Sequence, residues 1–215
     1  MRACAQVACY AAPIKTLVGR TRQARRVDSL GIKTHDDDGK DGWMSHANSD
    51  PFRLGFLAAI EDVERGFVGG LLVTNRFGRP LEFQCTAPVK PNRAQQILYG
   101  PTLRPFVLSE LIGRTLLDKI GVKPQLVLIE SNEILDLRQH VPMPVAFLTQ
   151  ADTSDETAIR CGKLALGMHA DYPADRTEIE RYAKLIPAEA TLSEPFERVR
   201  EALEETLRLG TARSA

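Results

Sequence analysis

Three short apolar runs between residues 54 and 89 are separated by short polar segments, and this pattern restricts the folds that the chain can adopt. The runs are Leu54–Ile60, Phe67–Thr74 and Leu81–Val89. The break at Asn75–Gly78 places Asn and Gly where β-turns favour them. In the third run apolar and polar residues alternate as far as Cys85. The pattern predicts an antiparallel β-meander of three strands.

The next segments alternate between helical and strand patterns. Apolar residues recur at helical spacing over Pro105–Ile120, where a proline at the start is tolerated. Leu126–Ile129 and Pro144–Leu148 are continuous apolar runs, typical of strands buried on both faces. A short helix through Ile134 and Leu137 separates them. The order predicts an α/β fold with a mixed sheet, in which the three-strand meander is followed by β-α-β-α-β with parallel strands and right-handed crossovers.

From about residue 153 onward the pattern is helical, so we expect C-terminal helices. Three Thr-to-Glu spacings match a capping box, in which a side chain caps the helix start and a Glu three residues later returns the bond. They begin at Thr153, Thr177 and Thr191. The last helix carries an apolar stripe from Phe196 to Leu207 and should end at Gly210.

Residues 1–43 show neither strand alternation nor a helical stripe, and within residues 1–27 every charge is positive. We expect a disordered N-terminal extension, because this composition buries too little apolar surface to offset chain entropy. An organellar targeting peptide, a weak secretory signal and an over-extended reading frame could each explain it. We favour the last, with the true start near Met44, and residues 44–215 as a single α/β domain.

The net charge of the chain indicates which classes of binding partner are favoured. The chain has 28 basic and 28 acidic residues, net zero, with +3 on residues 1–43 and −3 on the remainder. Nucleic acid is therefore not supported as a partner by net charge. No apolar run approaches the roughly 18 residues of a membrane span, so we expect no membrane partner. Four scattered cysteines fit reduced thiols, and we expect a cytoplasmic protein.

The predicted order of strands and helices over residues 54–149 is similar to that of the ribonuclease-H-like and actin-like superfold. The hairpin GGLLVTNRFGRPLEF also resembles hairpins of roadblock-type and profilin-like modules. These are resemblances of topology, and topology alone implies no particular activity.

The densest polar cluster lies between Asn75 and Gly100, at a hairpin tip and on a connector that leads into a helix. Guanidinium groups and helix N-termini favour anionic partners, although hydrated turns and helix caps would look the same. The candidate binding residues are Asn75, Arg76, Arg79, Lys90, Asn92, Arg93 and Tyr99.

A second constellation consists of three carboxylates, Glu61, Asp62 and Glu130. If the first and fourth strands are parallel neighbours, these residues end adjacent strands, where Mg²⁺ or Mn²⁺ could be held for phosphoryl chemistry. Roles in a turn and at a helix cap explain these three residues equally well. Further ligands could come from the stretch His169–Asp175, or from His140 at a turn, but a lone histidine in a loop is usually solvated.

We interpret the chain as a non-catalytic binding or regulatory module for an unknown protein or anionic ligand, with no cofactor and a possible homodimer. Serine nucleophile and P-loop motifs are absent from the sequence. The alternative is a metal-dependent phosphoryl-transfer or nuclease enzyme on a ribonuclease-H-like sheet. The two differ in whether Glu61 or Asp62 converges on Glu130 in an open cleft.

Overall fold

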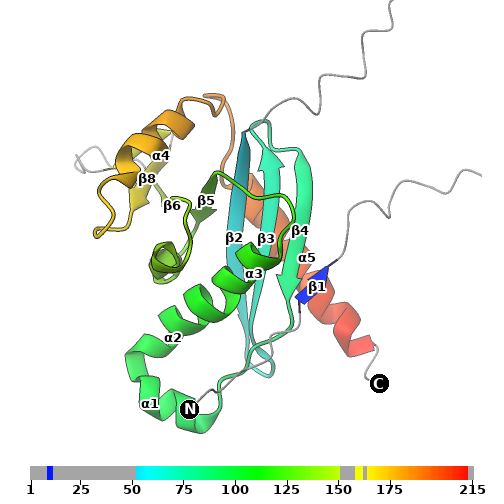
Figure 1. Ribbon diagram of the computed structural model, residues 1–215. Coiled ribbons are helices and arrows are strands. Elements are labelled where there is room, and N and C mark those ends of the chain that lie inside the picture. Colours follow the sequence, from blue (N-terminus) through cyan, green and yellow to red (C-terminus); the bar gives the residue numbers. More distant parts are fainter. Residues whose placement is uncertain (1–8, 12–51, 151–157, 162–163, 213–215) are drawn as a thin grey trace, which may run out of the picture.

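The structure, a computed structural model, describes residues 9–11, 52–150, 158–161 and 164–212. Its strands form one mixed sheet in the order β1-β4-β3-β2-β5-β6-β8-β7 (Figure 1). The strands are β1 (Cys9–Ala11), β2 (Arg53–Asp62), β3 (Gly66–Asn75), β4 (Pro80–Thr86), β5 (Leu126–Ile129), β6 (Val145–Gln150), β7 (Ile159–Cys161) and β8 (Leu164–Met168).

The predicted meander is present. β2 pairs with β3 and β3 pairs with β4, both antiparallel. The first turn has Gly66 at a φ of 89°, a left-handed conformation that glycine adopts without a steric cost. β4 ends at Thr86, before the predicted Val89, which instead forms a single bridge with Phe67.

The predicted parallel strands are also present. β5 lies between β2 and β6 and is parallel to both, with Leu54 opposite Leu126 and Val127 opposite Val145. All four residues of β5 are buried, as its continuous apolar run predicts. The α/β fold with a mixed sheet and C-terminal helices is therefore confirmed.

The prediction of a helical chain from about residue 153 is wrong for its first part. β8 pairs antiparallel with β6, and β7 pairs antiparallel with β8. The physical reason is that β6 would otherwise leave its outer backbone N–H and C=O groups unpaired, which a returning strand satisfies. The capping pattern at Thr153 lies outside the described residues.

The helices begin after β4. The predicted helix Pro105–Ile120 belongs to one continuous run whose middle section is a π-helix. The helical segments are α1 (Arg93–Tyr99), η3 (Gly100–Thr102), α2 (Leu103–Pro105), the π-helical η4 (Phe106–Gly113), α3 (Arg114–Lys119), the 3₁₀ segment η5 (Asn132–His140), α4 (Asp175–Ala183) and α5 (Glu194–Ala212).

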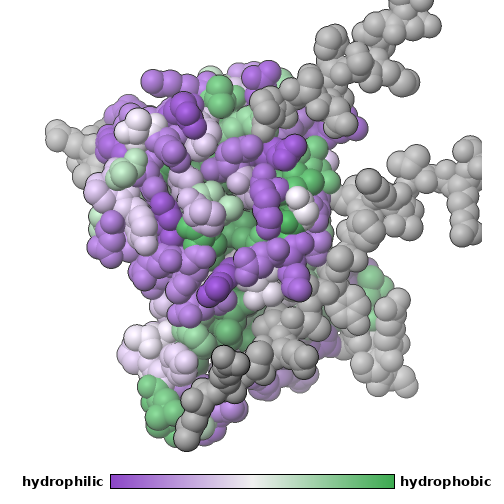
Figure 2. Space-filling model, viewed as in Figure 1, coloured by the Kyte–Doolittle hydropathy of each residue, from purple (hydrophilic) through white to green (hydrophobic). Residues whose placement is uncertain are grey.

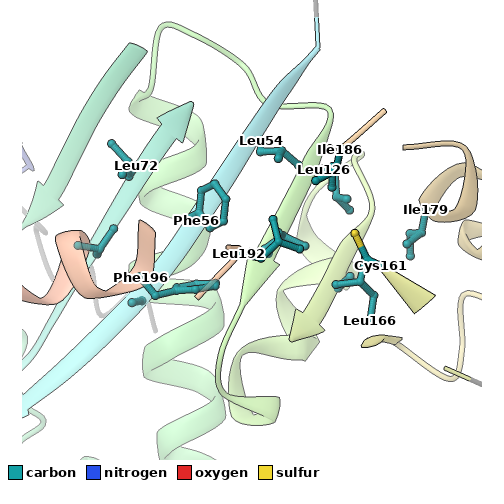
Figure 3. Packing of buried hydrophobic residues seen from close by; sticks show 14 of the residues in the cluster. Leu54, Phe56, Leu72, Leu126, Cys161, Leu166, Ile179, Ile186, Leu192 and Phe196 are labelled. Carbon is teal, nitrogen blue, oxygen red and sulfur yellow. The ribbon is translucent and has the colours of Figure 1, made fainter. Parts of the chain in front are cut away.

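Helices cover both faces of the sheet, so there are two cores. In Figure 1 the run from α2 to α3 crosses one face and α5 lies behind the other. Figure 3 shows the α5 side, where Phe196 packs against Phe56 with ring centroids 5.3 Å apart. β3 is buried along its whole length, as expected of a strand between two helical layers.

Strand β1 lies within the segment 1–43 that we expected to be disordered. Its three residues pair antiparallel with the edge of β4, Cys9 opposite Thr86. The rest of that segment, including Met44, lies outside the described residues. Among the helices that the structure describes, none is long and apolar enough to cross a bilayer.

Candidate functional site

A small cleft of about 140 Å³ opens where β5 ends beside β2. Its walls come from β2, the start of β3, the helical run α2–η4 and the first turn of η5. The polar residues that line it are Glu61, Arg104, Glu130, Ser131 and Glu133. Ligands in open α/β sheets bind at this kind of edge, outside the carboxyl ends of parallel strands.

Arg104 lies at the centre of this cleft and binds two carboxylates. Its Nη1 donates to Glu61 Oε2, and its Nε donates to Glu133 Oε1 at 3.1 Å. The guanidinium also lies over the Phe67 ring, 5.3 Å from the centroid. Hydrogen bonds to Glu61 and then to Glu133 raise the pKa of Arg104 above its ordinary value. All three side chains are nearly half exposed, so a ligand can reach them.

The local sequence explains how the two carboxylates meet. Glu61 is the ninth residue of β2 and shares its face with Leu57 and Ala59, toward the helical run that carries Arg104. Glu133 lies in the first turn of η5, whose start is capped by Ser131: the Ser131 hydroxyl accepts from the Glu133 N–H at 3.3 Å. Two segments distant in sequence thus present carboxylates to one cation.

Of the predicted trio, Glu61 and Glu130 both line this cleft, but only Glu61 binds Arg104. β2 and β5 are parallel neighbours as expected, but side chains alternate between the faces of a strand. Glu130 follows Ile129 and so turns to the α5 side, where it accepts a hydrogen bond from Arg200. Asp62 accepts from the backbone N–H groups of Glu64 and Arg65, at 3.0 and 2.8 Å, and stabilises the β2–β3 turn.

Within the described residues, no group of three or more His, Cys, Asp or Glu side chains is placed to hold a metal ion. His169 is 8% exposed and lies 3.5 Å from Asp136, with its Nδ1 accepting from the Asp171 N–H. Asp175 is taken up by Arg138, which donates to it through Nε at 2.5 Å and Nη2 at 3.0 Å. This cluster is therefore a buried ion pair of Arg138 and Asp175, beside a histidine that is hydrogen-bonded to the backbone.

The predicted binding residues lie at two ends of the sheet. The hairpin tip follows the last residue of β3, whereas the connector is bridged to Phe67 near its start. Because a ten-residue strand spans roughly 30 Å, the tip and the connector cannot form one continuous surface. The tip residues are Asn75, Arg76 and Arg79, and the connector and α1 residues are Lys90, Asn92, Arg93 and Tyr99.

Several of these residues have structural contacts. The Asn75 side chain is buried and accepts from the N–H groups of Phe77 and Arg79, both at 3.0 Å. Asn92 forms a capping box with Gln95 at the start of α1. Lys90 donates to the Glu64 carbonyl at 2.6 Å. These contacts explain turn and cap residues without a ligand.

Helix α1 contains no buried residue and projects from the lower edge of the molecule (Figure 1). Tyr99 stacks on Phe106 with ring centroids 4.5 Å apart. Ile97 and Leu98 are 65% and 82% exposed. Figure 2 shows a hydrophobic area over this part of the molecule.

Sequence reasoning missed Arg104 and Glu133. Arg104 lies between Pro101 and Pro105, one residue before the start of the predicted helix Pro105–Ile120. Glu133 lies two residues after the Ser131 cap, a position where an acidic residue has a sufficient explanation in the helix dipole. Only the fold brings these residues to the end of β2.

Comparisons with known proteins give a fold likeness only to solved structures: no family model and no curated protein matches. Human ENDOV is 15% identical, with a TM-score of 0.45 over 82% of this chain and 93% of that one. A variant catalytic domain of human Endonuclease V is 14% identical, with a TM-score of 0.39 over 81% and 92%. Endonuclease V of Ciona intestinalis in complex with DNA is 12% identical, with a TM-score of 0.31 over 66% and 59%.

These matches contradict two expectations from the sequence. We expected a non-catalytic module, and the balanced net charge spoke against nucleic acid, yet the similar structures are endonucleases and one of them holds DNA. The charge argument fails because a net charge sums over the whole surface and excludes only an overall field. A net charge of zero is compatible with local cationic groups such as Arg104 and Arg200. Identities this low assign no role to any residue.

Proposed function

We propose that this protein is a metal-dependent phosphoryl-transfer enzyme that cleaves nucleic acid at the cleft between β2, α2 and η5. The observation that carries the proposal is that Glu61 and Glu133 converge on one cation, the guanidinium of Arg104, in an open cleft at the end of parallel strands. The pair keeps Glu61 from the predicted trio and takes Glu133 in place of Asp62 and Glu130.

The donor set fits a divalent ion. Mg²⁺ is commonly held by one or two carboxylates, with the remaining positions taken by water and substrate phosphate. Glu61 and Glu133 supply two hard oxygen ligands, and Arg104 shows that both can bind a single positive centre. A bound Mg²⁺ or Mn²⁺ would act as a Lewis acid on a phosphoryl oxygen and lower the pKa of a bound water.

Arg104 has a second part in this proposal. If Glu61 and Glu133 held a metal instead, the Arg104 guanidinium would be available beside them, next to the Phe67 ring. A planar guanidinium binds two phosphate oxygens at once and neutralises their charge. Arg104 is therefore the residue that we expect to orient the scissile phosphate.

The first test uses thermal stability, because any ligand that binds only the folded state raises the melting temperature. We expect Mn²⁺ or Mg²⁺ to raise it in a dose-dependent manner in the wild type and to have no such effect in Glu61→Gln or Glu133→Gln. Glu204→Gln is the matched control and should keep the response, since Glu204 is exposed on α5 and does not line the cleft. Partly exposed ion pairs contribute only about 0–1 kcal/mol, so all three variants should fold.

The second measurement is cleavage of end-labelled DNA and RNA oligonucleotides with Mn²⁺. Glu133→Gln and Arg104→Met should lose at least about a hundredfold in rate, as for groups that stabilise transition-state charge. Metal binding that survives in both glutamine variants, or cleavage that persists in a metal chelator, would rule out this site.

A further inference from the structure

A second cavity, of about 300 Å³, lies at the other end of the sheet, between the β3–β4 hairpin tip and the start of α5. Its size is at the lower end of the range for small-molecule sites. Thr74, Arg76, Phe77 and Gly78 line it from the hairpin, and Thr191, Glu194 and Arg198 from the segment that enters α5. The cleft of Glu61 lies near the opposite ends of β2 and β3.

The charge of this cavity favours an anion. Two arginines line it and one carboxylate, Glu194, offsets them in part. Arg198 donates through Nη2 to Glu194 Oε2 at 2.7 Å and to the Gly78 carbonyl at 3.1 Å. Its Nε is buried and has no hydrogen-bond partner among the described residues. A buried donor of this kind costs free energy unless a ligand or water accepts from it.

The remaining walls favour a planar, partly apolar ligand. The apolar residues that line the cavity are Leu54, Phe56, Leu192 and Pro195. The first three of them are labelled in Figure 3. Phe77 is 66% exposed at the rim, and the Arg76 guanidinium lies over its ring at 4.8 Å from the centroid. An exposed aromatic ring with a neighbouring cation is the combination that stacks nucleobases and holds their phosphates.

We infer that this cavity binds one nucleotide unit, with the base on Phe77 and the phosphate between Arg76 and Arg198. The unit is either a free nucleoside monophosphate or one residue of a single strand. The inference does not depend on the cleft, because the two sites share no residue. It also separates Arg76 from Arg79, which shares the hairpin tip and does not line the cavity.

The experiment is calorimetric titration of the full chain with adenosine monophosphate and, separately, with a short unlabelled oligothymidylate. Both titrations are done in the absence of divalent metal. Arg76→Met and Phe77→Ala should each weaken binding by about tenfold or more, as for loss of a stacking or phosphate contact. Arg79→Met is the matched control and should change affinity less than about twofold. Circular dichroism checks that the variants fold.

Binding of both ligands assigns the site to free nucleotides, and binding of the oligonucleotide alone assigns it to a strand. The inference is overturned if the wild type binds neither ligand. An equal loss in Arg79→Met also overturns it, because the binding then reflects the general charge of the tip. Glu61→Gln with Glu133→Gln should leave the titration unchanged, so a failure of the cleft proposal is distinguishable from a failure of this one.

Discussion

Glu82 is a single side chain that joins two distant parts of the chain. Its carboxylate, on β4, accepts from the N–H groups of Gly121 at 3.1 Å and Val122 at 2.7 Å, just after α3. Burial raises the pKa of Glu82, but hydrogen bonds from Gln84, Gly121 and Val122 and the charge of Lys123 outweigh it. The pKa therefore lies below its ordinary value, and the charged form stabilises the fold.

This sets the sign of a pH dependence. A carboxylate whose folded pKa is lowered contributes stability above its unfolded pKa, about 4.3, and loses it as the pH falls through the folded value. We expect Glu82→Gln to reduce the urea midpoint at neutral pH, and the gap to the wild type to narrow below about pH 4. Glu204→Gln, on the exposed face of α5, is the control and should behave as the wild type. A gap that stays constant with pH would contradict the assignment.

At the scale of elements, the contact between β3 and the π-helical η4 fixes how closely a helix lies on the sheet. A Cβ on Gly69 would come within 2.0 Å of Ile112 Cγ2, so the two elements meet at a position without a side chain. Ile112 itself is 1% exposed. The glycine inside this strand therefore allows close packing by a neighbour.

A double-mutant cycle tests this contact. Ile112→Ala should cost about 2–5 kcal/mol through the cavity that it leaves. Gly69→Ala should cost about 1–3 kcal/mol by overpacking. In the double variant the new methyl group enters the space vacated by Ile112, so the loss should be smaller than the sum of the two. Denaturant unfolding measures all three, and strict additivity would show that the two residues do not touch.

The sequence was sufficient for elements whose pattern is local. The meander, β5, β6 and the helix over Pro105–Ile120 follow from apolar periodicity and turn residues. It was insufficient where the secondary structure of a segment depends on pairing with another strand. The strands β7 and β8 form because β6 has an open edge, although the chain nearby carries helix-capping residues. For the carboxylates, adjacency of strands does not give the partner of a side chain: Glu61 binds Arg104, whereas Glu130 binds Arg200.

At the scale of the molecule, the edge of the sheet at β4 is covered by β1 through three paired residues. A protein that begins at Met44 lacks this strand and keeps every core residue that the structure describes, the first of which is Phe52. We expect it to fold, with a melting temperature lower by about 2–4 °C, the shift for roughly 1 kcal/mol in a domain of this size. A shorter deletion of residues 1–8 should leave the melting temperature unchanged. Loss of a cooperative transition in the Met44 protein would contradict this expectation.

The parallel pairing of β2 with β5 has a consequence for the order of folding. Arg53 and Gln125 are joined at this pair although 72 residues separate them, whereas β2 and β3 are joined by a short turn. Closing so long a loop costs entropy before any contact is gained, so non-local parallel strands form slowly. We therefore expect the meander to form first during refolding, with the edge of β2 that faces β5 still unpaired and its apolar side chains uncovered. Intermolecular strand pairing competes at that stage, and dilution favours the native sheet.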